Sequence, residues 1–181
     1  MSSPASPLVV IGVGNVLLAD DAIGVRVVEA LRERVERSPG SLADGTRLID
    51  GGTLGADLAG WVRGSRGLVL VDAVRLGGRA GSVTILRGDE VAGDRAIDGT
   101  PADARGELVA LARLMGWLPG EVSLVGVEAA DIDLGVGLSP AVQAAIPEAA
   151  DAVIAELHRI DIQTRDRSRG SDAARTAGAL A

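Results

Sequence analysis

Short, unbroken aliphatic segments alternate along this chain with segments whose apolar residues recur at helical spacing. Residues 8–13 and 67–71 are continuous apolar runs followed by Gly14 and Asp72, which is typical of strands buried on both faces, and residues 122–127 (VSLVGV) are expected to form a further strand. Residues 22–37 and 139–160 instead carry apolar side chains three or four positions apart, which is typical of amphipathic helices. Strands that alternate with helices predict a largely parallel sheet with helices on both faces.

The fold expected from this pattern is a single-domain α/β, three-layer sandwich with a twisted, mostly parallel five-stranded sheet. The 181 residues are enough for one domain with one good core. We expect the domain to span residues 7–162, with disordered tails at 1–6 and 163–181. The remaining expected elements are strands at 46–49 and 82–86, helices at 55–62 and 105–115, and a long polar loop at 88–104.

Composition excludes several classes of protein and of active site. The chain has no cysteine, which rules out disulfides, thiolate metal sites and a cysteine nucleophile. Its single histidine, His158, lies late in the last expected helix and gives little support to a Ser-His-Asp mechanism. The formal net charge of −7 argues against a nucleic-acid binder. With no signal-like N-terminus and no membrane-length apolar run, we expect a cytoplasmic monomer that does not bind membranes.

Polar residues gather where the expected strands end. Ligands of parallel α/β sheets bind beyond the carboxyl ends of the strands, and the acidic or amide residues there are Asn15, Asp20, Asp21, Asp50 and Asp72. Asp20 and Asp21 have a simple alternative role as caps at the start of the first helix. Asp21 and Asp72 together would make a two-carboxylate site, able either to hold a divalent metal or to share a proton in acid–base chemistry.

The first strand also invites a dinucleotide interpretation, because Gly12 and Gly14 follow it as Gly-x-Gly. The dinucleotide fingerprint requires a third small residue three positions on, so that the helix can pack closely and receive the pyrophosphate. Position 17 is leucine, and several residues separate Asn15 from the expected helix. The turn chemistry therefore argues against a nucleotide site.

The segment VIGVGNVLLADDAIGVRVVEAL, residues 10–31, resembles the N-terminal motif of hydrogenase maturation endopeptidases, GxGN-x-L-x-x-D-(E/D)-x-x-G. The resemblance covers roughly residues 8–158. Four further segments match in order and at the family's spacing: LIDGGTLGADL (48–58), LVLVDAV (68–74), VSLVGVE (122–128) and GLSPAVQAAIPEA (137–149). Any one piece would be weak evidence, whereas five in register are specific.

The resemblance implies a function and a set of site residues. Members of the family remove a C-terminal extension from the large-subunit precursor of nickel–iron hydrogenase after nickel insertion, so nickel would arrive with the precursor. The family's nickel-recognition site uses an acidic residue at the helix start, an Asp at a strand end and a His in a later loop. The first two fall on Asp21 and Asp72, which would thus be both catalytic and metal-binding. The chain would then be an aspartic-type, metal-recognising endopeptidase.

The third family position departs from the pattern. It falls at Pro101 or Ala102, neither of which binds a metal, and Asp103 or Asp98 in the same loop is the available substitute. Oxygen-only sites hold nickel less tightly than sites with an imidazole. Three interpretations remain: an endopeptidase whose substrate lends a ligand, an accessory protein that binds the precursor without cleaving it, and a protease whose carboxylates orient water without needing the His. The first or third, a protease, is favoured.

Overall fold

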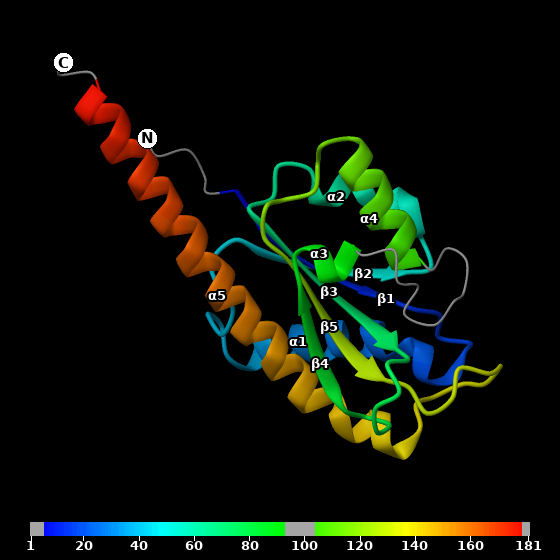
Figure 1. Ribbon diagram of the computed structural model, residues 1–181. Coiled ribbons are helices and arrows are strands. Elements are labelled where there is room, and N and C mark those ends of the chain that lie inside the picture. Colours follow the sequence, from blue (N-terminus) through cyan, green and yellow to red (C-terminus); the bar gives the residue numbers. More distant parts are fainter. Residues whose placement is uncertain (1–5, 93–103, 179–181) are drawn as a thin grey trace.

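The computed structural model describes residues 6–92 and 104–178, and they form the expected three-layer α/β arrangement (Figure 1). The five strands lie in the order β2-β1-β3-β5-β4, with only β4 antiparallel to its neighbour. The strands are β1 (Leu8–Val13), β2 (Thr46–Gly52), β3 (Gly67–Val74), β4 (Val83–Arg87) and β5 (Val122–Glu128). The helices are η1 (Ala19–Ala22), α1 (Ile23–Arg37), η2 (Gly55–Leu58), α2 (Ala59–Val62), α3 (Asp89–Ala92), α4 (Ala104–Leu114) and α5 (Pro140–Gly178).

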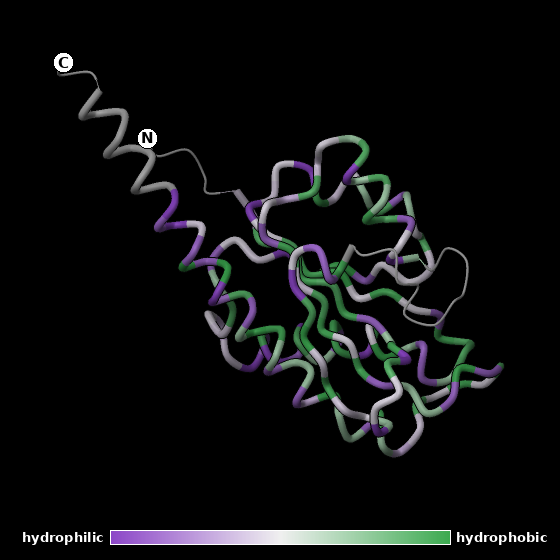
Figure 2. Tube along the Cα trace, viewed as in Figure 1, coloured by the Kyte–Doolittle hydropathy of each residue, from purple (hydrophilic) through white to green (hydrophobic). Residues whose placement is uncertain are grey.

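Alternate residues of each central strand face opposite helical layers. Leu8 and Val10 of β1 belong to the core formed with α1 and α5, whereas Val9 and Ile11 belong to the core formed with α2 and α4. Hydrophobic residues accordingly run along the central strands in Figure 2. Both faces of the central strands are therefore buried, as the unbroken aliphatic runs predicted.

Two glycines in the first βα unit allow close packing of the helix against the sheet. A Cβ on Gly24 would lie 2.2 Å from the carbonyl oxygen of Val13 and 2.4 Å from that of Val71. A Cβ on Gly12 would lie 2.1 Å from the Gly24 carbonyl oxygen. Close packing of α1 against strands β1 and β3 explains why glycine stands at these two positions. A nucleotide-binding role is not needed to explain them.

The last helix differs from the expectation. The sequence pattern predicted an end near Ile160 and a disordered tail from 163, but α5 continues to Gly178. Ion pairs explain part of the extension: Arg165 bonds Asp161 at 2.8 Å, and Arg167 reaches Glu121 at 2.7 Å. Although α5 has 39 residues, no helix within residues 6–92 and 104–178 is long and apolar enough to cross a membrane.

Other element boundaries also differ from the predicted ones. Strands β2 and β3 run past the predicted ends at 49 and 71, so Asp50 and Asp72 lie inside strands rather than after them. Asp72 is held in the sheet by pairing of β3 with β5, opposite Gly126. Within the loop expected at 88–104, α3 forms a short helix, and residues 93–103 lie outside the described part of the chain.

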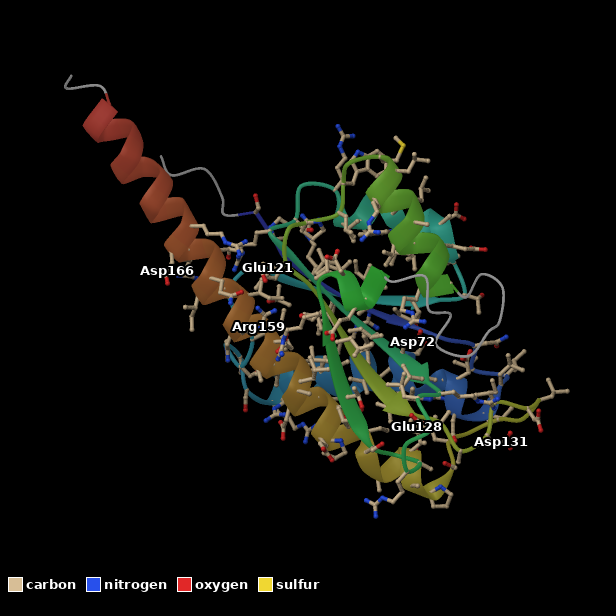
Figure 3. All side chains as sticks on the ribbon, viewed as in Figure 1. Asp72, Glu121, Glu128, Asp131, Arg159 and Asp166 are labelled. Atoms are coloured by element: carbon tan, nitrogen blue, oxygen red, sulfur yellow. The ribbon has the colours of Figure 1, made fainter. Side chains whose placement is uncertain are left out.

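A buried carboxylate network fixes the edge of the sheet to α5. Glu156 accepts hydrogen bonds from Arg87 Nε at 3.1 Å, from Ser123 Oγ at 2.7 Å and from Arg159 Nε at 3.0 Å. Burial alone would raise the pKa of Glu156, but these bonds outweigh it and lower the pKa to about 2. Arg159 also contacts Glu121, both labelled in Figure 3, so the network spans α5 and the start of β5.

Candidate functional site

The candidate site lies at the carboxyl ends of β1 and β3. In Figure 3 Asp72, Glu128 and Asp131 lie toward the end of the sheet at which the arrowheads of β3 and β5 point. Glu128 is buried there and accepts the backbone N–H groups of Leu76 and Gly77, which anchors the connection after β3. The same sheet edge was predicted to carry the chemistry, because parallel strands direct their following loops to one side.

Asp21 is held against the loop that follows β1. The backbone N–H of Asn15 donates to Asp21 Oδ2 at 2.6 Å. Gly14, which precedes Asn15, has φ +133, and a Cβ there would be 1.8 Å from the Asp21 carbonyl oxygen. Only glycine fits this conformation and this contact. The Gly-x-Gly-Asn motif thus brings the backbone of the loop against Asp21.

Asp20, the neighbouring carboxylate, has a structural role. It is fully buried, and its oxygens accept the backbone N–H groups of Ala130 at 2.9 Å, Asp131 at 3.0 Å and Ser139 at 2.6 Å. Burial acts to raise the pKa of Asp20, but the backbone hydrogen bonds outweigh it, so the pKa lies below the ordinary value. The interpretation of Asp20 or Asp21 as a helix cap is wrong, since neither η1 nor α1 has a side-chain cap.

Asp72 forms an ion pair inside the protein. Its Oδ2 lies 3.3 Å from Nε of Arg105, and the two side chains are 8% and 7% exposed. Arg105 comes from the first turn of α4, which packs over η2 and α2 on that face of the sheet. A strand-end carboxylate and a helix-start guanidinium therefore meet at the candidate site.

Asp21 and Asp72 line one pocket of about 300 Å³, as the sequence predicted. Asn15 also lines it, whereas Asp20 and Asp50 are not among the lining residues; Asp50 accepts the N–H of Gly52 beside it. The full lining is Val13, Gly14, Asn15, Leu18, Asp21, Thr53, Asp72, Ala104, Arg105 and Glu107. A pocket of this volume accommodates a short stretch of peptide or a small ligand.

The ligand set for a metal is incomplete in the part of the chain that can be described. Within residues 6–92 and 104–178, no group of three His, Cys, Asp or Glu side chains is arranged to hold a metal ion. The predicted third position, Asp103, lies outside the described residues, as do Asp98, Pro101 and Ala102. His158 is exposed on α5 and does not line the pocket.

Sequence reasoning missed the three polar lining residues Thr53, Arg105 and Glu107. Arg105 carried a usable signal, because a cation in the first turn of a helix opposes the helix dipole and calls for a nearby carboxylate. Thr53 and Glu107 carried none, since polar residues beside a loop or in a first helical turn are ordinary.

Near the pocket lies an exposed apolar surface, here named the apolar rim and made of Val16, Leu17, Leu134 and Val136. Its two loops are joined by a parallel bridge between Leu18 and Gly135 and by the bond from the Gly135 N–H to the Leu17 carbonyl oxygen. Figure 1 shows these loops projecting together from the same end of the molecule. Clustered exposed apolar side chains commonly mark a contact surface for another protein.

Comparison with known proteins gives a consistent result. Residues 25–156 match the family model described as hydrogenase maturation protease. The chain is 35% identical over 162 residues to the hydrogenase 2 maturation protease of Escherichia coli strain K12, which covers 88% of this chain and 96% of the relative. It is 36% identical over 160 residues to the hydrogenase expression/formation protein HupM of Azotobacter chroococcum mcd 1, covering 87% of this chain and 74% of that one.

Solved structures agree with the sequence comparison. The hydrogenase maturating endopeptidase HybD from E. coli superposes with a TM-score of 0.72 at 34% identity, covering 84% of this chain and 93% of that chain. A hydrogenase 2 maturation peptidase from Thaumarchaeota archaeon SCGC_AB-539-E09 gives a TM-score of 0.62 at 31% identity, covering 84% and 99%. Sequence and fold both match over most of each chain.

Proposed function

Because the chain belongs to the hydrogenase maturation protease family, we propose that it cleaves the C-terminal extension from the large-subunit precursor of a nickel–iron hydrogenase after nickel insertion. Nickel is part of the substrate in this proposal and arrives bound to the precursor. The observation that carries the proposal is the convergence of Asp21 and Asp72 on one pocket at the carboxyl edge of the sheet.

The two carboxylates supply oxygen ligands and a means of handling protons. Asp21 and Asp72 come from different elements, so a metal delivered between them would register that the precursor is loaded. A carboxylate of the same pair accepts a proton from the attacking water at the scissile peptide. Among the described residues, no group of three ligands is present, so Asp103, which lies outside them, or the precursor itself would complete the ligand set.

The apolar rim supports a protein substrate rather than a small molecule. Leu18 lines the pocket, while Leu17 and Val16 beside it are exposed. Leu134 and Val136 extend this surface from the loop before α5. A folded precursor that docks on the rim would present its C-terminal segment to the pocket, and the binding energy of the docked surface would orient the scissile bond.

The test is cleavage of a nickel-loaded precursor, followed as a size shift on a gel. We expect wild-type protein to produce the shortened large subunit, and Asp72→Asn and Asp21→Asn each to lower the rate by at least about 100-fold, as for loss of an acid–base group. Asp50→Asn is the matched control, because Asp50 is an exposed carboxylate of the neighbouring strand outside the pocket lining. Unchanged cleavage by both pocket variants would contradict the assignment.

A second candidate function is binding of the precursor without cleavage. The Arg105–Asp72 ion pair favours it, since the guanidinium contacts the carboxylate that would otherwise bind the metal or the attacking water. A stable complex of wild-type protein with loaded precursor, without any size shift over many hours, would identify this function.

A further inference from the structure

The ion pair between Arg105 and Asp72 stands in the pocket where a metal would have to bind. Arg105 Nε is 3.3 Å from Asp72 Oδ2, and both residues line the pocket together with Asp21. At this separation the guanidinium interacts with the same carboxylate that a divalent cation would use. The two cations therefore compete for Asp72.

Placing the Arg105 guanidinium at this position is unfavourable in free energy. Its side chain is only 7% exposed, so it has lost most of its hydration, and it sits in the first turn of α4, where the helix dipole is positive. A buried ion pair often contributes less to stability than apolar residues of the same size. The pair is therefore better explained by what it does to the pocket than by a gain in stability.

Without Arg105, Asp21 and Asp72 would present two carboxylates in one partly enclosed pocket, which is an attractive environment for any free divalent cation. An arginine stays protonated at all physiological pH values and repels a second cation at close range. We propose that Arg105 is a specificity-determining residue that keeps free divalent ions out of the pocket. This proposal rests on the proposed function in one respect, which is the expectation that Asp72 binds a metal carried by the docked precursor.

A metal brought by the precursor meets different conditions from a free ion. The precursor contributes its own contact surface, so the free energy of docking offsets the repulsion by Arg105 and its displacement from Asp72. No covalent bond changes in this exchange, because the guanidinium and the metal simply trade places beside the carboxylate. The pocket thereby responds to metal that is already seated in a protein and ignores metal in solution.

The test measures binding of nickel alone by isothermal titration calorimetry, with no precursor present. We expect wild-type protein to bind Ni²⁺ weakly and Arg105→Gln to bind it at least about tenfold more tightly, because a nearby positive charge has been removed. Arg105→Lys retains the charge and should bind as weakly as wild type. The double variant Arg105→Gln/Asp72→Asn should lose the gain, which assigns it to Asp72.

Arg113→Gln is the matched control, since Arg113 is on the same helix, 54% exposed and outside the pocket. It should bind nickel as wild type does. Arg105→Met, of similar length but apolar, carries the same prediction as Arg105→Gln, and circular dichroism decides which of the two is folded and titrated. A folded Arg105 variant that binds Ni²⁺ no more tightly than wild type overturns the proposal, and so does failure of both variants to fold.

The nickel-binding experiment tests the role of Arg105 separately from precursor cleavage. Tighter nickel binding by Arg105→Gln with no cleavage of precursor by wild-type protein would retain the role of Arg105 and remove the proposed function. Cleavage that depends on Asp72, together with unchanged nickel binding by Arg105→Gln, would retain the function and remove the role of Arg105.

Discussion

Glu156 holds the edge strand β4 against α5, and replacing it with glutamine tests how the sheet edge is stabilised. The folded protein lowers the pKa of Glu156 from 4.5 to about 2. That difference corresponds to about 3 kcal/mol of unfolding free energy at neutral pH. The side chain is only 3% exposed, so solvent screens little of this contribution. Glutamine keeps the shape but loses the charge, and its amide N–H groups would face the donors of Arg87 and Arg159.

The sign of the pH dependence follows from the direction of the shift. Because the pKa of Glu156 is lower in the folded state than in the unfolded state, its contribution is complete above the unfolded value of 4.5. It is lost as the pH falls from 4.5 toward about 2. The difference in stability between wild type and Glu156→Gln should therefore be constant at neutral pH and should shrink in acid.

Urea unfolding followed by far-UV circular dichroism gives the measurement. We expect Glu156→Gln to be less stable by about 3 kcal/mol near pH 7, with the difference clearly smaller near pH 3. Glu33→Gln is the control, because the Glu33–Arg37 pair is 70% and 73% exposed at 3.4 Å, and the expected change is below about 1 kcal/mol. A difference that stays the same from about pH 7 to about pH 3 would refute the reasoning.

Three further predictions concern the site and its support. Asp20→Asn should lower the unfolding free energy by about 2–3 kcal/mol in urea, because the amide can serve the three backbone donors less well than the buried carboxylate; a change below about 0.5 kcal/mol would contradict this. Gly24→Ala should lower the melting temperature by at least about 5 °C, since its Cβ would lie 2.2 Å from a carbonyl oxygen of β1, and an unchanged Tm would disprove the packing argument. Leu134→Ser should weaken precursor binding in a surface-immobilised assay by about fivefold or more, whereas Leu114→Ser, similarly exposed at the end of α4, should not. Equal affinities of Leu134→Ser and wild type for the precursor would show that the apolar rim is not part of the interface.

Much of the fold could be predicted because one physical rule governs all the central strands. A strand buried on both faces is apolar at nearly every position, and residues 8–13 and 67–71 satisfy that rule without help from distant residues. Residues 122–127 satisfy it except at Ser123, whose buried hydroxyl donates to Glu156. The strand ends were predicted less well. Asp72 reads as the first loop residue, but pairing with β5 keeps it in β3. The length of α5 also depends on a distant partner, since Arg167 bonds Glu121.

The candidate site divides in the same way. Asp21 and Asp72 could be located because strand ends in a parallel sheet converge, and the family motif pointed to the same two positions. Arg105 could not be assigned to Asp72 from the sequence, since the pairing depends on how α4 packs over the sheet. Asp103 remains a prediction, because it lies outside the described residues.

Asp20 and Asp21 show why adjacent identical residues acquire different roles. The short 3-10 segment η1 turns the Asp20 carboxylate to the loop before α5 and the Asp21 carboxylate to the pocket. The backbone N–H groups of Ala130 and Ser139 donate to the Asp20 carboxylate. These bonds hold that loop, which carries part of the apolar rim, beside the segment that contains Asp21. One buried carboxylate thus ties the surface that would meet the precursor to the carboxylate that would act on it. A change at Asp20 should therefore disturb docking and cleavage together, although Asp20 itself touches neither the pocket nor the solvent.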